Sequence, residues 1–197
     1  MSSITLNVTY NFKYAISSGH DLVKGGVFHL IAHPLCERDS NEPPLKNLIY
    51  LHKQLDVTIE KLTDELKNNE SPSPMAAMLV SYLAILSDQS FQGTLENSIA
   101  CGYGINESLM RFYELEVCPN YSDRIAKEIF GLLRMLSPLS FNSLPEIVSD
   151  TIIVSKELTL YDWMTLPLKS IKGIVLVNSV LDSHSSVIAQ SLNIPTF

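Results

Sequence analysis

The spacing of hydrophobic residues changes twice along this chain of 197 residues. Residues 26–31 form a short β-branched and aromatic run that begins at a glycine pair, which predicts a buried strand. Over residues 45–136 the apolar side chains recur every three or four positions, which is the period of amphipathic helices. Residues 151–155 and 173–177 return to short β-branched runs, typical of strands covered on both faces of a parallel sheet. An α/β unit interrupted by a helical bundle is the simplest fold that contains both patterns.

Five helices are predicted in the helical block, and two shorter ones follow it. The second helix is apolar on nearly every face, which is typical of a helix inside a bundle. Ser73 and Pro74 supply its N-cap and first-turn proline, and Asn106 is expected to cap the fourth helix. The predicted ranges are 45–66, 75–87, 91–102, 106–115 and 122–136 for the block, then 158–168 and 185–192. Residues 194–197 look like the start of one more strand, and residues 1–24 carry no clear pattern.

The composition excludes several classes of function. The formal net charge is −7, the pI is about 5.2, and the 14 Lys and Arg residues are scattered, so the basic surface that nucleic acid requires is missing. No uncharged apolar run approaches the roughly 18 residues needed to cross a bilayer, and the N-terminus lacks the layout of a signal peptide. We therefore expect a cytoplasmic protein that binds neither nucleic acid nor membrane.

Neither the cysteines nor the histidines predict a metal site. Cys36, Cys101 and Cys118 are widely spaced and form no C-x-x-C pair, so free buried thiols are expected. His29 and His33 are spaced to share one face, but no Asp, Glu or Cys nearby completes a ligand set. We expect no metal to bind to this chain.

One histidine lies where a strand leads into a helix. His184 follows the strand at 173–177 and stands at the start of the helix at 185–192. Unpaired backbone N–H groups and the positive end of the helix dipole can bind anionic oxygens there. A largely neutral imidazole is also a competent nucleophile near neutral pH. His184 is therefore a candidate phosphate carrier; the alternative is that Ser183 simply caps a helix whose next residue is exposed.

This segment resembles the phosphohistidine segment of enzyme I of the bacterial phosphoenolpyruvate:sugar phosphotransferase system. In that family a strand leads to a T-S-H motif, a small-residue helix and an Ile-Pro pair, and an acidic or polar residue followed by Leu-Thr lies upstream. The run YLAILSD and the last bundle helix also look like their counterparts in the family. The matching positions are Glu157, Leu158, Thr159, Ser183, His184, Val187, Ile188, Ala189, Leu192, Ile194 and Pro195, with residues 82–88 and 121–136 in the helical block.

The resemblance implies a fold, a division into domains and a chemistry. The fold would be an α/β swivelling phosphohistidine domain, residues 1–33 and 146–197 with its C-terminal part truncated, and an inserted all-α helical bundle subdomain, residues 34–145. His184 would receive a phosphoryl group from phosphoenolpyruvate, through a C-terminal barrel that is absent from this chain. It would pass that group to a histidine phosphocarrier protein docked on the helical subdomain. Magnesium would belong to the barrel, so no cofactor is expected in this chain, and because the barrel supplies the family's dimer contact, a monomer is expected.

The residues expected to support His184 are Ser183, Asp182, Thr159 and Thr165. The sequence departs from the family here, because Ser-Val-Leu-Asp at 179–182 replaces Gly-Gly-Arg-Thr. A carboxylate two residues from a phosphorylated imidazole repels it by on the order of several kcal/mol before solvent screening. Asp182 has two alternative roles, as an N-cap or as a hydrogen-bond partner that orients the His184 ring.

Two further departures leave the activity open. The family's histidine-supporting threonine aligns with Trp163, which we expect to be a packing residue, with Thr165 nearby; the family's lysine before the second helix aligns near Met75. The alternative function is therefore a catalytically degenerate relative that binds the carrier or another protein as a regulator. A third alternative is a swivelling domain of the pyruvate phosphate dikinase group, which shares the T-S-H pattern, but the helical block argues against it.

Overall fold

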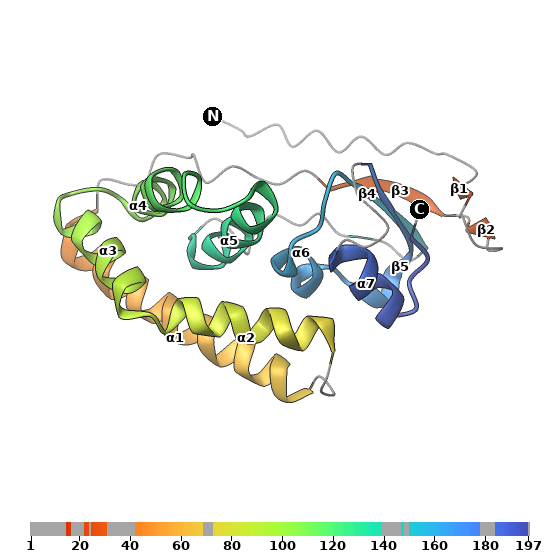
Figure 1. The fold of residues 1–197 in the computed structure, drawn as a ribbon, viewed down its shortest axis with the longest axis horizontal. Coiled ribbons are helices and arrows are strands. Elements are labelled where there is room, and N and C mark those ends of the chain that lie inside the picture. The colour runs from red at the N-terminus through yellow and green to blue at the C-terminus, as the bar shows by residue number, and fades with distance from the viewer. Residues whose placement is uncertain are drawn as a thin grey trace. The chain divides into compact units, whose positions relative to one another are not determined.

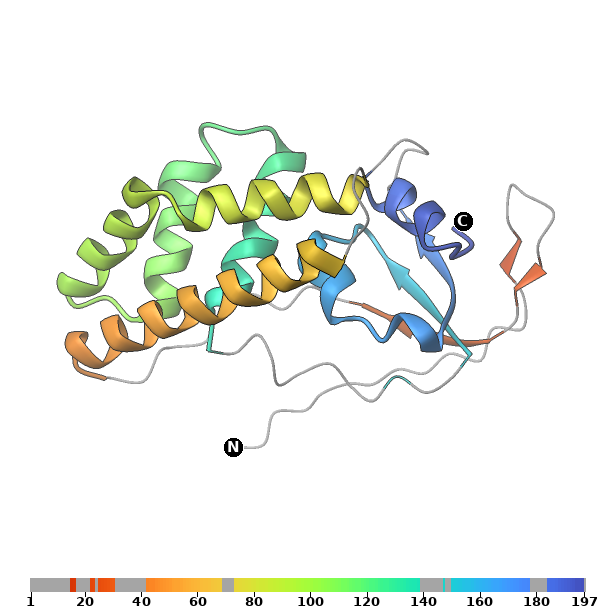
Figure 2. The same cartoon turned by 90° about the horizontal axis from the view of Figure 1, so that it is seen from below.

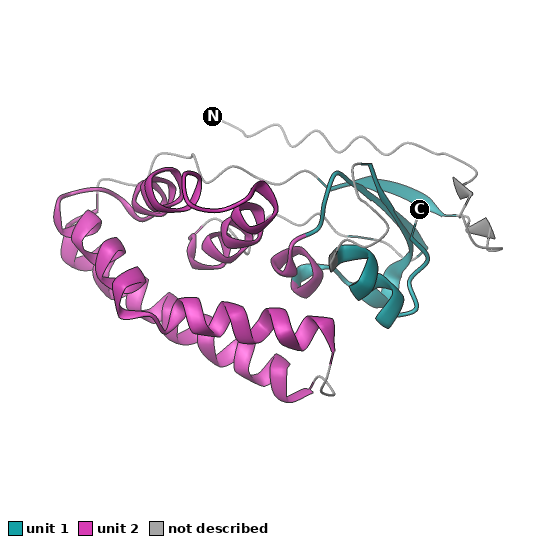
Figure 3. Ribbon diagram, viewed as in Figure 1, with its two compact units in different colours: residues 1–32, 144–158, 165–197 teal, residues 33–143, 159–164 magenta. Residues whose placement is uncertain are grey.

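The computed structural model (Figures 1 and 2) describes residues 15–16, 22–23, 25–30, 42–68, 73–138, 147, 150–177 and 184–196. The chain divides into two compact units, here called the α/β unit and the helical unit (Figure 3). The α/β unit comprises residues 1–32, 144–158 and 165–197, and the helical unit comprises residues 33–143 and 159–164. The short segment 159–164, which the resemblance assigns to the α/β domain, is thus grouped with the helices.

Three parallel strands form the main sheet of the α/β unit. Their order is β3 (Gly26–His29), β4 (Thr151–Ser155) and β5 (Ile171–Leu176), with Gly26 opposite Thr151 and Thr151 opposite Ile171. The central strand is covered on both faces, because Ile152 and Ile153 point to opposite sides and both are buried. The strands are parallel and lie where the β-branched runs predict them.

Shorter elements complete this unit. A 3₁₀ turn (Leu168–Ser170) precedes β5, α7 (His184–Ser191) follows it, and β1 (Ala15–Ile16) pairs antiparallel with β2 (Leu22–Val23). The strand start expected near the end of the chain is present as a parallel bridge between Thr196 and Ile174. Gly25 admits no side chain, because a Cβ there would overlap the carbonyl oxygen of Asp150.

The helical unit is a bundle of the five predicted helices with two additions, a π-helix and most of the short helix α6. It contains α1 (Pro44–Asn68), α2 (Pro74–Leu86), α3 (Gln89–Ala100), α4 (Ile105–Phe112), the π-helix η1 (Tyr113–Val117), α5 (Asp123–Leu136) and most of α6 (Leu160–Thr165). Its core consists of fully buried apolar side chains from α1 to α5: Leu51, Leu62, Leu79, Leu86, Leu95, Ile99, Leu109, Leu132, Leu133, Met135 and Leu136. The apolar period thus predicts the bundle helices correctly, with ends shifted by a few residues.

One predicted helix cap is present and one is not. Ser73 Oγ accepts a hydrogen bond from Ala76 N at 3.0 Å at the start of α2. The fourth helix begins after Gly104, so the prediction that Asn106 caps it is wrong. The Asn106 side chain is used elsewhere, because its Oδ1 accepts a buried hydrogen bond from Ser137 Oγ at 2.7 Å.

Two of the three cysteines are at the surface. Cys101 and Cys118 are exposed free thiols, so the prediction of buried thiols is wrong for both. The physical reason is their position, since Cys101 ends α3 and Cys118 ends η1, where the chain turns in contact with solvent. Cys36 lies outside the described residues.

The described residues were also searched for spanning helices and metal clusters. None of their helices combines the length with the apolar character that crossing a bilayer requires. The same residues contain no group of three or more His, Cys, Asp or Glu side chains arranged to hold a metal ion. His29 lies in β3, whereas His33 is outside the described part of the chain.

Candidate functional site

The helix α7 begins at His184, the residue that the sequence analysis singles out. Asp182 and Ser183 lie outside the described residues, so the roles predicted for them remain predictions. The other two predicted supporting residues, Thr159 and Thr165, lie at the two ends of α6.

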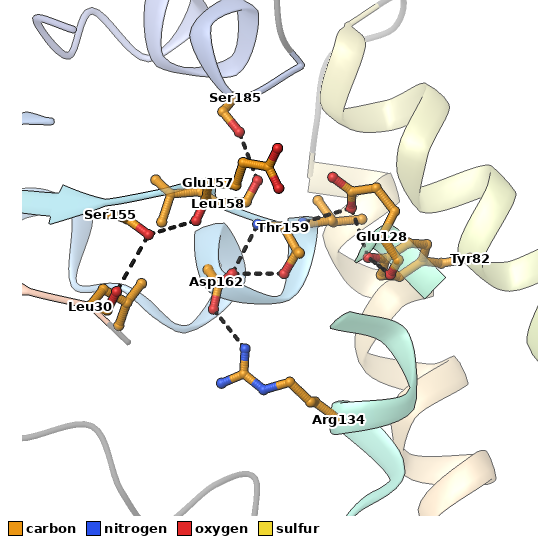
Figure 4. A network of polar contacts seen from close by, with 11 residues as sticks. Leu30, Tyr82, Glu128, Arg134, Ser155, Glu157, Leu158, Thr159, Asp162 and Ser185 are labelled. Atoms are coloured by element: carbon orange, nitrogen blue, oxygen red, sulfur yellow. Dashed lines mark hydrogen bonds and ion pairs between the residues drawn. The ribbon is translucent and has the colours of Figure 1, made fainter. Parts of the chain in front are cut away.

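A buried hydrogen bond anchors the first turn of α7. Ser185 Oγ donates to the carbonyl oxygen of Leu158 at 2.7 Å (Figure 4), and the Ser185 side chain is buried. Ile188 and Ala189, one turn further on, are fully buried. Since the residue directly after His184 is held in this way, the backbone of His184 has a defined position within the α/β unit.

The other end of α7 is closed by a left-handed residue. Asn193 has φ 55°, a conformation that asparagine tolerates at helix C-termini. Leu192 N donates to Ile188 O at 3.0 Å, and Ile194 N donates to Ala189 O at 2.9 Å. These bonds satisfy carbonyls of the last turn, so the short helix is held at both ends.

Ser155, the last residue of β4, shapes the turn that presents Leu158. Its hydroxyl lies 2.6 Å from Glu157 O and 3.4 Å from Leu30 O (Figure 4). Leu158 follows this turn directly, and its side chain is buried. Burial of the side chain holds the Leu158 carbonyl in place for the hydrogen bond from Ser185. The end of β4 therefore supports the start of α7.

A capping contact holds the start of α6. Thr159 N and Thr159 Oγ1 both donate to Asp162 Oδ2, at 2.9 and 2.8 Å (Figure 4). This is the spacing of a capping box, in which an acidic residue three positions along reaches back to the first N–H. The hydroxyl of Thr159 is thus bonded to Asp162.

Asp162 also forms a buried ion pair with Arg134 on α5. Arg134 Nη1 lies 3.0 Å from Asp162 Oδ1, and the two side chains are 11% and 7% exposed. The guanidinium carbon lies 4.3 Å from the centroid of the Tyr161 ring, a cation–π contact. Because an unpaired buried charge carries a large desolvation penalty, each of these groups requires the other. The pair connects α6 to α5 within the helical unit.

Glu128 provides a second contact between α5 and α6. Its Oε2 accepts hydrogen bonds from Leu160 N at 3.2 Å and from the Tyr82 hydroxyl at 3.0 Å. A carboxylate is favourable at this place, because the first turn of a helix has free N–H groups and a positive dipole end. Burial, reinforced by the negative charge of Glu128, raises the pKa of Tyr82 well above its usual value, so this hydroxyl remains a donor.

Sequence reasoning missed Glu128 and Arg134. Arg134 interrupts a run of buried residues on α5, and a charged residue inside such a run is the signal that indicates a buried pair. Glu128 gives no comparable signal. Gly131 completes the contact, because a Cβ there would lie 2.6 Å from Thr159 Oγ1, so only glycine permits this approach of α5 to α6.

Trp163 on α6 is buried, with 1% of its surface exposed. It occupies the position that the resemblance aligns with a histidine-supporting threonine, so no hydroxyl is present there. Its indole Nε1 has no hydrogen-bond partner among the described residues. Trp163 is a packing residue, as predicted.

The fold of this chain is similar to that of several solved structures, two of which are described here. One, described as "N-terminal domain of Enzyme 1 - Nitrogen", has a TM-score of 0.58 and 23% sequence identity, covering 86% of this chain and 76% of that chain. The other, an NMR solution structure of Enzyme I (nEIt), has a TM-score of 0.52 and 20% identity, covering 81% of this chain and 70% of that chain. No protein-family model and no curated protein matches the sequence.

These similarities show the fold. The chain has the architecture of the N-terminal domain of enzyme I, in which a helical bundle is combined with a small parallel α/β part. The fold class implied by the resemblance of the last segment is therefore confirmed over most of the chain.

Proposed function

We propose that this chain is a phosphoryl-carrying module of the enzyme I type, with His184 as the carrier residue. The observation that carries the proposal is that α7 begins at His184 and is anchored, through Ser185, to Leu158. A residue at a helix start lies beside the free N–H groups of the first turn, which bind the oxygens of a phosphoryl group.

The proposed transfer consists of two in-line displacements. In the first, the neutral imidazole of His184 attacks the phosphorus of phosphoenolpyruvate held by a separate barrel domain; a P–N bond forms, the P–O bond breaks and the enolate of pyruvate leaves. In the second, the imidazole of a histidine phosphocarrier protein attacks the same phosphorus, and the P–N bond to His184 breaks. Positioning supplies most of the catalysis of such steps, which suits a helix held at both ends.

The helical unit is the proposed docking site for the carrier. Asp56, Glu60 and Asp64 are exposed and four residues apart on α1, so they share one face. The chain as a whole has a net charge of −7. An acidic face suits a carrier with basic residues around its histidine, because complementary charge favours encounter and orientation.

The second candidate function is binding without turnover, as a regulator. Two features favour it: Trp163 is buried where the family has a supporting threonine, and Asp182 adds a negative charge two residues before His184 in the sequence. In this candidate the carrier docks on the helical unit and no phosphoryl group is transferred.

A labelling experiment separates the two candidates. The purified chain is mixed with phosphorylated carrier, and intact mass spectrometry at neutral pH measures acid-labile phosphate on it. The proposal predicts one phosphoryl group on the wild-type chain, one on His52→Ala, which removes an exposed histidine of α1, and none on His184→Ala. Carrier binding without a label supports the regulator, and the absence of both binding and label contradicts both candidates.

A further inference from the structure

The helical unit contains a cavity of about 230 Å³ between α3, α4 and η1. Its apolar walls include Tyr103, Phe112 and Leu115. The Phe112 ring packs edge-on against Phe91, with centroids 5.0 Å apart, which gives the cavity a firm wall. One side is formed by a π-helix, and single π turns recur at functional sites in proteins. No residue of α6 is among the described residues that line this cavity.

Ser98 on α3 and Ser108 on α4 also border the cavity. Their hydroxyl oxygens are shielded from solvent, so a ligand in the cavity makes no direct hydrogen bond to either of them.

The same cavity is lined by an arginine that has no anionic partner in the described part of the chain. Arg111 stacks over Tyr103, with its guanidinium carbon 4.1 Å from the ring centroid, and this is its one contact of the polar or cation–π kind among the described residues. Stacking holds the guanidinium plane while leaving its N–H donors available for a planar anion. One carboxylate, that of the exposed Glu116, also lines the cavity, so the charges facing a ligand are one of each sign.

We propose that this cavity is a binding site for a small organic carboxylate. The ligand carboxylate pairs with Arg111, and the apolar body of the ligand lies against Phe112 and Leu115. An engineered cavity of about 150 Å³ accommodates benzene, so this volume accommodates a ligand of roughly ten non-hydrogen atoms. The site is independent of the phosphoryl transfer proposed for His184.

Cys101 supplies a reporter for occupancy. Its exposed thiol lines the cavity, whereas the exposed thiol of Cys118 lies outside it. Alkylation of the wild-type chain by iodoacetamide, followed peptide by peptide with mass spectrometry, measures both rates in one sample. Phenylacetate is expected to slow the alkylation of Cys101 in proportion to site occupancy and to leave that of Cys118 unchanged.

Two matched probes test the charge requirement. The neutral 2-phenylethanol and the cationic 2-phenylethylamine have nearly the same size as phenylacetate but no carboxylate, so both are expected to bind at least about tenfold more weakly. If either slows Cys101 alkylation as well as phenylacetate does, or if phenylacetate does not slow it, the proposal is overturned.

Variants assign the binding to Arg111. Arg111→Gln is expected to raise the dissociation constant of phenylacetate, measured by calorimetric titration, by about tenfold. Arg124→Gln removes the same group at an exposed position outside the cavity and is expected to leave this dissociation constant unchanged. Circular dichroism checks that each variant is folded. An unchanged dissociation constant in a folded Arg111→Gln variant contradicts the assignment.

Discussion

The absence of one side chain, at Gly131, determines how closely α5 and α6 can approach. A Cβ there would lie 2.6 Å from Thr159 Oγ1 and 2.8 Å from Thr159 Cβ, so Gly131→Ala forces these segments apart. We expect this substitution to lower the free energy of unfolding by about 1–3 kcal/mol, measured by urea denaturation. Gly93→Ala, on α3 with nothing within 4 Å of the added Cβ, is the matched control and should gain about 0.5–1 kcal/mol from helix propensity. Equal effects at the two sites would rule out the steric explanation.

The contribution of an ion pair to the free energy of unfolding depends on how deeply the pair is buried. Arg134→Met leaves the buried carboxylate of Asp162 without its cation, and we expect the free energy of unfolding to fall by about 3–5 kcal/mol. Lys46→Met breaks an exposed ion pair, in which Lys46 Nζ lies 2.9 Å from Glu42 Oε1. This substitution should change the free energy of unfolding by about 1 kcal/mol or less. Urea denaturation of both variants makes the comparison. Similar losses in the two would show that burial is not the deciding factor.

At the scale of the helices, one serine attaches α7 to the turn after β4. Ser185→Ala leaves the buried Leu158 carbonyl without its donor, and we expect a loss of about 1–2 kcal/mol in the free energy of unfolding. Ser191→Ala is the matched control on the same helix, because Ser191 Oγ bonds only to Ile188 O within α7 and its side chain is exposed. It should change stability by a few tenths of a kcal/mol. If Ser185→Ala proved as mild as Ser191→Ala, the anchor would be unimportant.

The contact of α2 with α5 through Tyr82 and Glu128 gives a pH dependence. Burial and the Glu128 charge raise the folded-state pKa of Tyr82 above the unfolded value of about 10. Its stabilising contribution is therefore fully present below about pH 10 and is lost as the pH rises through the folded-state pKa. Urea denaturation across this alkaline range should show a steeper loss of stability for the wild-type chain than for Tyr82→Phe. Tyr121→Phe, at an exposed position, should keep the wild-type slope.

The sequence predicts these helices and strands only where burial of one face imposes a regular spacing of apolar residues. The strands and bundle helices follow from their periods, and the short helix predicted at 185–192 is present as α7, shifted by one residue. The π-helix does not follow from a period, because one wider turn leaves no repeat in the sequence. The apolar period also includes Leu45 and Ile125, yet these are 69% and 47% exposed, since a period identifies a face of a helix and not how much of it is covered. The Arg134–Asp162 pair joins residues 28 positions apart, which no local pattern records.

At the scale of the whole molecule, the helical unit is assembled from two separate stretches of chain, 33–143 and 159–164. A fragment of residues 42–138 keeps α1 to α5 but lacks Asp162, so Arg134 has no buried carboxylate to pair with. We expect Arg134→Met to change the unfolding free energy of this fragment by about 1 kcal/mol or less, against the larger loss in the full chain. Denaturation of the four proteins measures the difference, and an equal loss in fragment and full chain would show that Asp162 is not the partner that matters.

The adjacent strands β3 and β4 are hydrogen-bonded neighbours, although the bundle lies between them in the sequence. The chain leaves the sheet after His29 and returns at Thr151 in the neighbouring strand. The bundle is therefore an insertion between two adjacent strands of a three-stranded sheet. A parallel connection needs only about a dozen residues, and nothing in the order or register of the strands depends on a longer one. Insertions of other lengths are therefore compatible with the same sheet, as long as α5 keeps Glu128, Gly131 and Arg134, which contact the segment 159–162 between β4 and β5.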